Sequence, residues 1–144
     1  MSAMPGSTDS VGSDQPQPNR APTVLIVEDD VLIRMSIADY LRDCGYHVIE
    51  AGNGDEAVTV MKTDTEVDVV FSDVMMPGSI DGFSLAKWIR QERPCVRIIL
   101  TSGVAKSARE ARDLCDDGPL VGKPYDHRAV ESRIRALLAS RDGA

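Results

Sequence analysis

The chain has 144 residues, which is long enough for one domain with a sizeable hydrophobic core. Its net charge of -7 and its pI near 4.7 argue against a protein that coats nucleic acid, because such proteins cluster Lys and Arg on one face. The three cysteines, Cys44, Cys95 and Cys115, lie far apart without a CxxC pair. That spacing favours buried or idle thiols in a reducing compartment over a disulfide framework or a zinc site.

The start of the chain differs in composition from the rest. Ser, Gly, Pro, Gln, Asn and Asp dominate it and no apolar residue recurs periodically, so it cannot offset the entropy lost on ordering. We therefore predict a disordered tail over residues 1–22 and one folded domain over residues 23–141. No basic region precedes an apolar core, and no apolar run approaches the ~20 residues of a membrane span, so we expect a cytoplasmic protein.

Short apolar runs alternate with helix-like segments from Thr23 onward. Strands are predicted over residues 23–27, 47–50, 67–72, 97–100 and 120–122, mostly as the continuous apolar runs typical of buried parallel strands. Helices are predicted over residues 31–43, 54–62, 81–93, 106–114 and 126–139. Gly45 suits a left-handed stop after the first helix, and Asp126 can cap the last one. Such repeats predict an α/β fold, with right-handed crossovers that place helices on both faces of a parallel sheet.

Polar residues stand at the ends of four of these strands. They are Glu28, Asp29 and Asp30 after the first strand, Asp73 after the third, Thr101 after the fourth and Lys123 after the fifth. In an open parallel sheet the carboxyl ends of the strands face one side, where ligands bind, so we expect these side chains to meet there. Together they would suit a divalent cation and a phosphoryl group.

The carboxylates predict a metal site. Glu28, Asp29 and Asp73 offer the hard oxygen ligands that Mg²⁺ prefers, and a divalent ion would relieve their mutual repulsion. Asp30 suits a different role, the N-cap of the first helix. A turn at residues 77–78 would let the backbone carbonyl of Met75 face the metal as a further ligand.

The remaining residues predict a reaction with a phosphoryl group. A carboxylate beside a bound metal can attack phosphorus, because the metal shields the charge of both reactants, so Asp73 is the candidate nucleophile. Lys123 would supply a cation to a phosphoryl oxygen, and Thr101 would donate its hydroxyl hydrogen to another.

From Thr23 to Ser140 the chain resembles a receiver domain of the two-component response regulators, the fold of the chemotaxis regulator. The matching segments are residues 24–30, 72–77, 81–82, 100–101 and 123–124. The resemblance implies a flavodoxin-like, doubly wound sheet of five parallel strands in the order 2-1-3-4-5, with five helices. It also implies that Asp73 accepts a phosphoryl group from a histidine kinase or a histidine phosphotransfer protein. In such domains the positions of Glu28 and Asp29 hold Mg²⁺, and those of Thr101 and Lys123 contact the phosphoryl group.

A receiver is a signalling domain rather than an enzyme that turns over a substrate. Phosphorylation would favour one of two conformations, because Thr101 and Lys123 contact the phosphoryl group only after the loops close. Neither Met75 nor Gly103 can orient a hydrolytic water, so we expect slow autodephosphorylation. The segment after the last helix is too short for a DNA-binding domain. We therefore expect a stand-alone receiver that signals or relays phosphate to a partner protein, without contacting nucleic acid or a membrane.

The first predicted helix carries apolar residues on more than one face. Its core stripe is predicted to consist of Ile33, Ile37 and Leu41. Leu32 and Met35 fall off that stripe, so we expect them to be exposed near Asp73 and to dock a histidine-bearing helical bundle. His47 and His127 are not placed for catalysis and receive no role.

Three features depart from the family pattern. The loop over residues 76–82 is one residue longer than usual, Gly122 is smaller than usual, and Leu120 stands where an aromatic residue often couples to the threonine. Leu120 therefore puts in question the usual output surface of the fourth helix, fifth strand and fifth helix. None of these changes removes a chemical group from the site.

Three alternatives stay open at this point. The first is a Mg²⁺-dependent hydrolase with an aspartyl nucleophile, although such enzymes usually carry an Asp-x-Asp pair after the first strand. The second is an interaction module that uses the receiver fold without phosphorylation. The third is a receiver cut from a longer protein.

Overall fold

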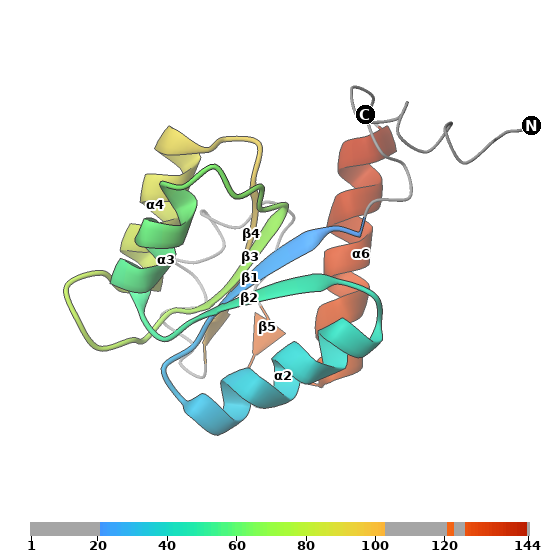
Figure 1. Cartoon of the computed structure of the whole chain (residues 1–144), viewed down its shortest axis with the longest axis horizontal. Coiled ribbons are helices and arrows are strands. Elements are labelled where there is room, and N and C mark those ends of the chain that lie inside the picture. The colour runs from blue at the N-terminus through green and yellow to red at the C-terminus, as the bar shows by residue number, and fades with distance from the viewer. Residues whose placement is uncertain (1–20, 103–120, 123–125, 144) are drawn as a thin grey trace, which may run out of the picture.

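The computed structural model describes residues 21–102, 121–122 and 126–143, and its centre is a parallel sheet (Figure 1). The strands are β1 (Thr23–Val27), β2 (His47–Ala51), β3 (Val69–Asp73), β4 (Arg97–Ser102) and β5 (Val121–Gly122). They pair in parallel in the order β2-β1-β3-β4-β5, which confirms the predicted flavodoxin-like arrangement. Because β1 lies between β2 and β3, the residues that follow it are close to the ends of both neighbours.

Helices cover both faces of this sheet. The described ones are α2 (Val31–Asp43), α3 (Gly54–Met61), α4 (Gly82–Glu92) and α6 (His127–Gly143). Helices α3 and α4 lie on one face, and α2 and α6 lie on the other (Figure 1). None of these described helices has the length and apolar character that a membrane span needs.

Strand β1 shows why the sheet needs cover on both sides. Its successive side chains point to opposite faces, as in any strand. Leu25 and Val27 belong to the core beneath α3 and α4, whereas Val24 and Ile26 belong to the core beneath α2 and α6. All four are buried, so β1 is apolar on both faces from Val24 to Val27, as predicted for a central parallel strand.

The predicted helix ends are confirmed at three positions. The Asp30 carboxylate accepts the backbone N–H of Ile33 at 3.1 Å and caps α2. The Asp126 carboxylate accepts the backbone N–H of Arg128 at 2.9 Å, directly before α6. Gly45 has a φ of 102° after α2, the left-handed conformation that glycine adopts at little cost.

The element boundaries differ from the predictions by a few residues. Strand β3 begins at Val69 rather than at residue 67. Asp68 lies directly before it, where its backbone N–H donates to the Thr23 carbonyl at 2.9 Å and its carboxylate accepts the Thr23 N–H at 2.8 Å. At its other end β3 includes Asp73. Helix α6 continues to Gly143, past the predicted end at residue 139. The helix predicted over residues 106–114 lies outside the described residues.

One predicted core residue is wrong. Ile37 and Leu41 of α2 are buried as expected, together with Ala38, but Ile33 is 38% exposed. The buried residues of α2 all belong to its later turns, so the first turn lies beyond the cover of the hydrophobic core. The 3.6-residue periodicity alone does not show where along a helix the core ends.

Gly82, at the start of α4, packs directly against the end of β3. A Cβ atom at this position would overlap the backbone oxygen of Asp73 and would lie 2.6 Å from the Cα of Val74. Because backbone atoms cannot swing aside, we expect Gly82→Ala to lower the free energy of unfolding by about 1–3 kcal/mol, as measured by urea denaturation. Gly52→Ala is the control, since its Cβ would meet no atom of the described residues nearer than 3.4 Å. Equal losses in the two variants would contradict this interpretation.

Candidate functional site

Three carboxylates meet where β1 and β3 end. One oxygen each from Glu28, Asp29 and Asp73 lies within 4.8 Å of the others. Glu28 and Asp73 are 3% and 4% exposed, whereas Asp29 is open to solvent. The parallel pairing of β1 with β3, which sets Val27 opposite Ser72, brings these residues together. The structure thus has the cluster that the strand-end pattern predicts.

The donor set of this cluster fits a hard divalent cation. Three like charges at this spacing repel one another, and two of them are removed from water, so a cation between them would stabilise the site. All the donors are oxygen atoms, which suits Mg²⁺, and the exposed side at Asp29 leaves room for the waters that Mg²⁺ retains. The cluster therefore has the chemistry to bind Mg²⁺.

Local hydrogen bonds orient the two buried carboxylates. Glu28 Oε2 accepts the backbone N–H of Asp30 at 3.1 Å, and Asp73 Oδ1 accepts the backbone N–H of Met75 at 3.2 Å. Asp30 itself stays outside the cluster as the cap of α2. Each buried carboxylate is therefore oriented by the turn that directly follows its strand.

Thr101 lies beside Asp73 on the neighbouring strand. The two residues are register partners in the pairing of β3 with β4. Thr101 is fully buried, and its Oγ1 has no hydrogen-bond partner among the residues that the structure describes. A buried hydroxyl without a partner costs about 1–3 kcal/mol, so its presence at this position calls for a functional explanation.

The loop after β3 turns as predicted and is attached to α3. Gly78 has a φ of 102°, which gives the turn expected at residues 77–78. The Ser79 hydroxyl donates to Asp55 Oδ1 at 3.1 Å, which links the longer loop to the first turn of α3. Met75 is 63% exposed at the start of this loop, and the metal-ligand role of its carbonyl stays a prediction.

Several predicted positions cannot be placed. Lys123, Leu120 and Gly103 all lie outside the described residues, so the roles assigned to them stay predictions.

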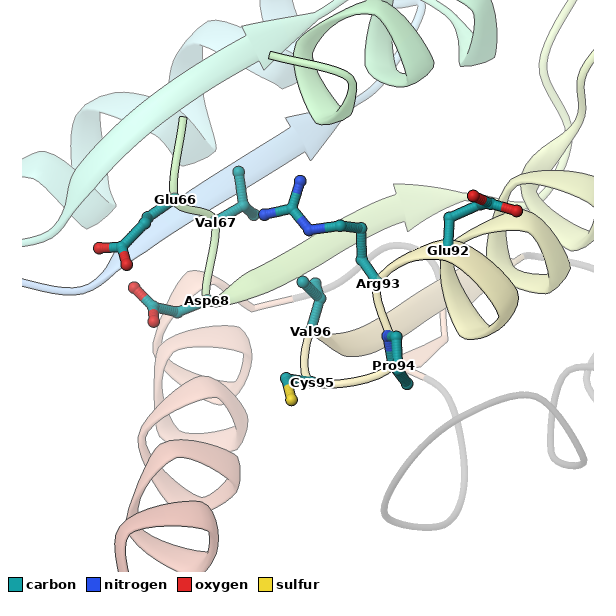
Figure 2. A pocket seen from close by; sticks show the side chains of 8 residues that line it. All are labelled: Glu66, Val67, Asp68, Glu92, Arg93, Pro94, Cys95 and Val96. Atoms are coloured by element: carbon teal, nitrogen blue, oxygen red, sulfur yellow. The ribbon is translucent and has the colours of Figure 1, made fainter. Parts of the chain in front are cut away.

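A separate pocket lies at the opposite end of the same strands (Figure 2). It has a volume of about 320 Å³ and is lined by residues 66–68 and 92–96, which precede β3 and β4. Arg93 crosses it and donates to the backbone oxygens of Met61 at 2.6 Å and Thr65 at 3.5 Å. None of the predicted site residues lines this pocket, so it is distinct from the carboxylate cluster.

Sequence reasoning missed two residues, Arg34 and Glu50, that form an ion pair beside the carboxylate cluster. Arg34, in the first turn of α2, bonds to the backbone of Glu28 and to the side chain of Glu50 at the end of β2. An arginine one turn into the helix, with an acidic residue at the end of the following strand, is the signal that could have suggested the pair.

Comparison with known proteins settles the family. The sequence matches the response regulator receiver domain over residues 24–135. The chain belongs to this family. The receiver domain is 37% identical over 123 residues to the sensor kinase CckA of Brucella abortus (strain 2308), a match that covers 83% of this chain and 13% of the kinase. It is 32% identical over 115 residues to the transcriptional regulatory protein ResD of Bacillus subtilis, covering 80% and 47% of the two chains. The chain thus spans less than half of either relative.

Solved receiver structures share the fold of this receiver domain. The receiver domain of the Francisella response regulator 1452 has a TM-score of 0.72 and 28% identity, covering 81% of this chain and 95% of its own. The response regulator TrrA of Thermotoga maritima, solved in complex with Mg²⁺-BeF, has a TM-score of 0.72 and 26% identity, with coverages of 81% and 98%. The resemblance found in the sequence is therefore confirmed for family and fold.

Binding of Mg²⁺ to the carboxylate cluster should raise the free energy of unfolding. A Mg²⁺ concentration of ten times the dissociation constant should add about 1.4 kcal/mol to the free energy of unfolding, seen as a higher melting temperature. Asp29→Asn should remove most of this gain, because it deletes one carboxylate from the cluster. Asp64→Asn, a change of an exposed carboxylate outside the cluster, is the control. A gain that is the same in Asp29→Asn as in the control would contradict the assignment.

Proposed function

We propose that this receiver domain accepts a phosphoryl group on Asp73 from a histidine kinase or a histidine phosphotransfer protein, in a Mg²⁺-dependent reaction. The observation that supports this most is the cluster itself, in which a buried Asp73 lies within 4.8 Å of two further carboxylates. The relative TrrA, solved with Mg²⁺-BeF, supports the same kind of site here.

The proposed step moves one phosphoryl group. A carboxylate oxygen of Asp73 forms a bond to phosphorus while the bond from phosphorus to the imidazole nitrogen of the donor breaks, and the electron pair stays on that nitrogen. The product is an acyl phosphate on Asp73. Mg²⁺, held by Glu28, Asp29, Asp73 and the Met75 carbonyl, would shield the negative charge on both reactants.

Thr101 gives the phosphoryl group a means of changing the conformation. Its buried hydroxyl, which has no partner among the described residues, would donate to a phosphoryl oxygen on the adjacent Asp73. Lys123 would contact a second phosphoryl oxygen. A ligand shifts an equilibrium only by its differential affinity for the two states, and these contacts would supply that difference. The switched receiver would then signal to a partner protein or pass the phosphoryl group on.

Exposed apolar side chains near the site support docking of a protein donor. Leu32 is 78% exposed and Met35 is 49% exposed, as predicted from their position off the core stripe. They lie three residues apart in α2 and so share one side of the helix. Exposed apolar patches mark interaction surfaces in soluble proteins, and this one would suit a histidine-bearing helical bundle.

We place this exchange in the cytoplasm. Cys44 and Cys95 are free and exposed, a state that reducing compartments maintain.

The phosphorylated form of the protein should be long-lived, because the Met75 side chain carries no group able to orient a hydrolytic water. Transcriptional regulation is the activity named for ResD, and no contact of this chain with nucleic acid is proposed.

The phosphorylation itself can be tested by intact-mass measurement. After incubation with acetyl phosphate and Mg²⁺, we expect the protein to gain one phosphoryl group. Asp73→Asn and added chelator should each abolish the gain, because the first removes the nucleophile and the second the cation. A gain that persists in Asp73→Asn would place the acceptor elsewhere. If the mass rises neither with acetyl phosphate nor with a phosphorylated histidine protein, the result would favour an interaction module that works without phosphorylation.

The docking surface can be tested with two kinds of donor. Leu32→Ala combined with Met35→Ala should slow transfer from a phosphorylated histidine protein by about tenfold. This corresponds to a loss of about 1.4 kcal/mol, and the few residues that dominate an interface cost more than about 1 kcal/mol each when truncated. Phosphorylation by acetyl phosphate should keep its rate, since a small donor needs no docking surface. Equal slowing with both donors would contradict a docking role.

A further inference from the structure

The backbone of Glu28 is held at both of its polar groups. Its N–H donates to the backbone oxygen of Ala51 at 3.1 Å, and its carbonyl oxygen accepts from Arg34 Nη1 at 2.9 Å. Its carboxylate is also oriented, by the backbone N–H of Asp30. The first of these contacts comes from the strand pairing and the third from the local turn. Of these three contacts, the one from Arg34 is made by a side chain of another element.

The Arg34 guanidinium is itself anchored. Its Nε donates to Glu50 Oε1 at 3.1 Å, so this one planar group links α2, which carries it, to β2 and to the end of β1. The two side chains are 19% and 25% exposed, which shields this ion pair from much of the solvent. An arginine can do this because its donors form a rigid fork, whereas the single ammonium of a lysine has no such geometry.

Arg42, further along α2, also bonds to the Glu50 carboxylate. Its Nη1 donates to Glu50 Oε2 at 3.1 Å, and its Nη2 donates to the backbone oxygen of Val48 at 3.1 Å. Arg42 therefore shares the anchor of Arg34 but contacts β2 rather than the Glu28 backbone. A comparison of substitutions at Arg34 and Arg42 therefore separates an effect on the cluster from a general effect on the packing of α2 against β2.

We propose that Arg34 is a positioning residue for the metal site. Its bond to the Glu28 carbonyl fixes the peptide that joins Glu28 to Asp29, and so fixes the direction in which both carboxylates leave the backbone. Without that bond, cation binding must also order this peptide against the repulsion of the carboxylates. The inference rests on the proposed function, because it concerns the same cation.

A titration with Mg²⁺, followed by the amide signals of the protein in nuclear magnetic resonance spectra, tests this role. We expect Arg34→Met to raise the dissociation constant for Mg²⁺ by about tenfold, the low end of the effect of residues that orient metal ligands. Arg42→Met should stay within about twofold of the wild type, because Arg42 bonds to Glu50 and to the Val48 backbone, and its removal leaves the bond from Arg34 to the Glu28 carbonyl in place. Urea denaturation without metal would establish that both variants fold.

The outcomes separate the inference from the proposed function. A wild-type protein that shows no Mg²⁺ binding would overturn the proposed function. A wild type that binds, with Arg34→Met equal to it or with both variants weakened equally, would overturn the positioning role alone. If Arg34→Met does not fold, the dissociation constant of Arg34→Lys for Mg²⁺ tests the proposal instead. It keeps the charge but lacks the fork, so it should also bind Mg²⁺ more weakly, and unchanged affinity would overturn the proposal.

Discussion

The mutual repulsion of three carboxylates at the carboxyl edge of the sheet is the constraint on which the site depends. Glu28 and Asp73 are buried, and one oxygen of each lies within 4.8 Å of an oxygen of Asp29, so the three like charges repel one another and a bound divalent cation would relieve that repulsion. The order β2-β1-β3 creates this juxtaposition, because it sets the ends of β1 and β3 side by side. The apolar core beneath both faces keeps those strand ends in place.

Backbone groups around the cluster orient its two buried carboxylates. Backbone N–H groups of Asp30 and Met75 each donate to one buried carboxylate, and α4 closes against the end of β3 at Gly82. Thr101 keeps a buried hydroxyl next to Asp73 without a partner among the described residues. The oriented carboxylates suit a cation, and the neighbouring Thr101 hydroxyl suits an anion. Mg²⁺ together with a phosphoryl group would supply both.

The sequence predicted this edge because strand-end chemistry depends on local order. Continuous β-branched runs mark β1 and β3, and a polar residue directly after such a run must lie at the carboxyl edge. Caps such as Asp30 were predictable for the same reason, since they depend on a few consecutive residues. Ile33 was assigned to the core wrongly, because a helical period does not show where the core stops. The bridge from Arg34 to Glu50 joins residues on different elements, and its exact contacts need the tertiary structure.

Paramagnetic broadening by Mn²⁺, read from the amide signals of the folded protein, tests the central assignment most directly. Mn²⁺ takes the same oxygen ligands as Mg²⁺ and weakens the signals of nearby nuclei. At substoichiometric Mn²⁺ the amides of Glu28, Asp29 and Asp73 should be lost first, and excess Mg²⁺ should restore them. Loss that begins elsewhere, for example around the pocket of Figure 2, or that Mg²⁺ does not reverse, would contradict a divalent-cation site at the ends of β1 and β3.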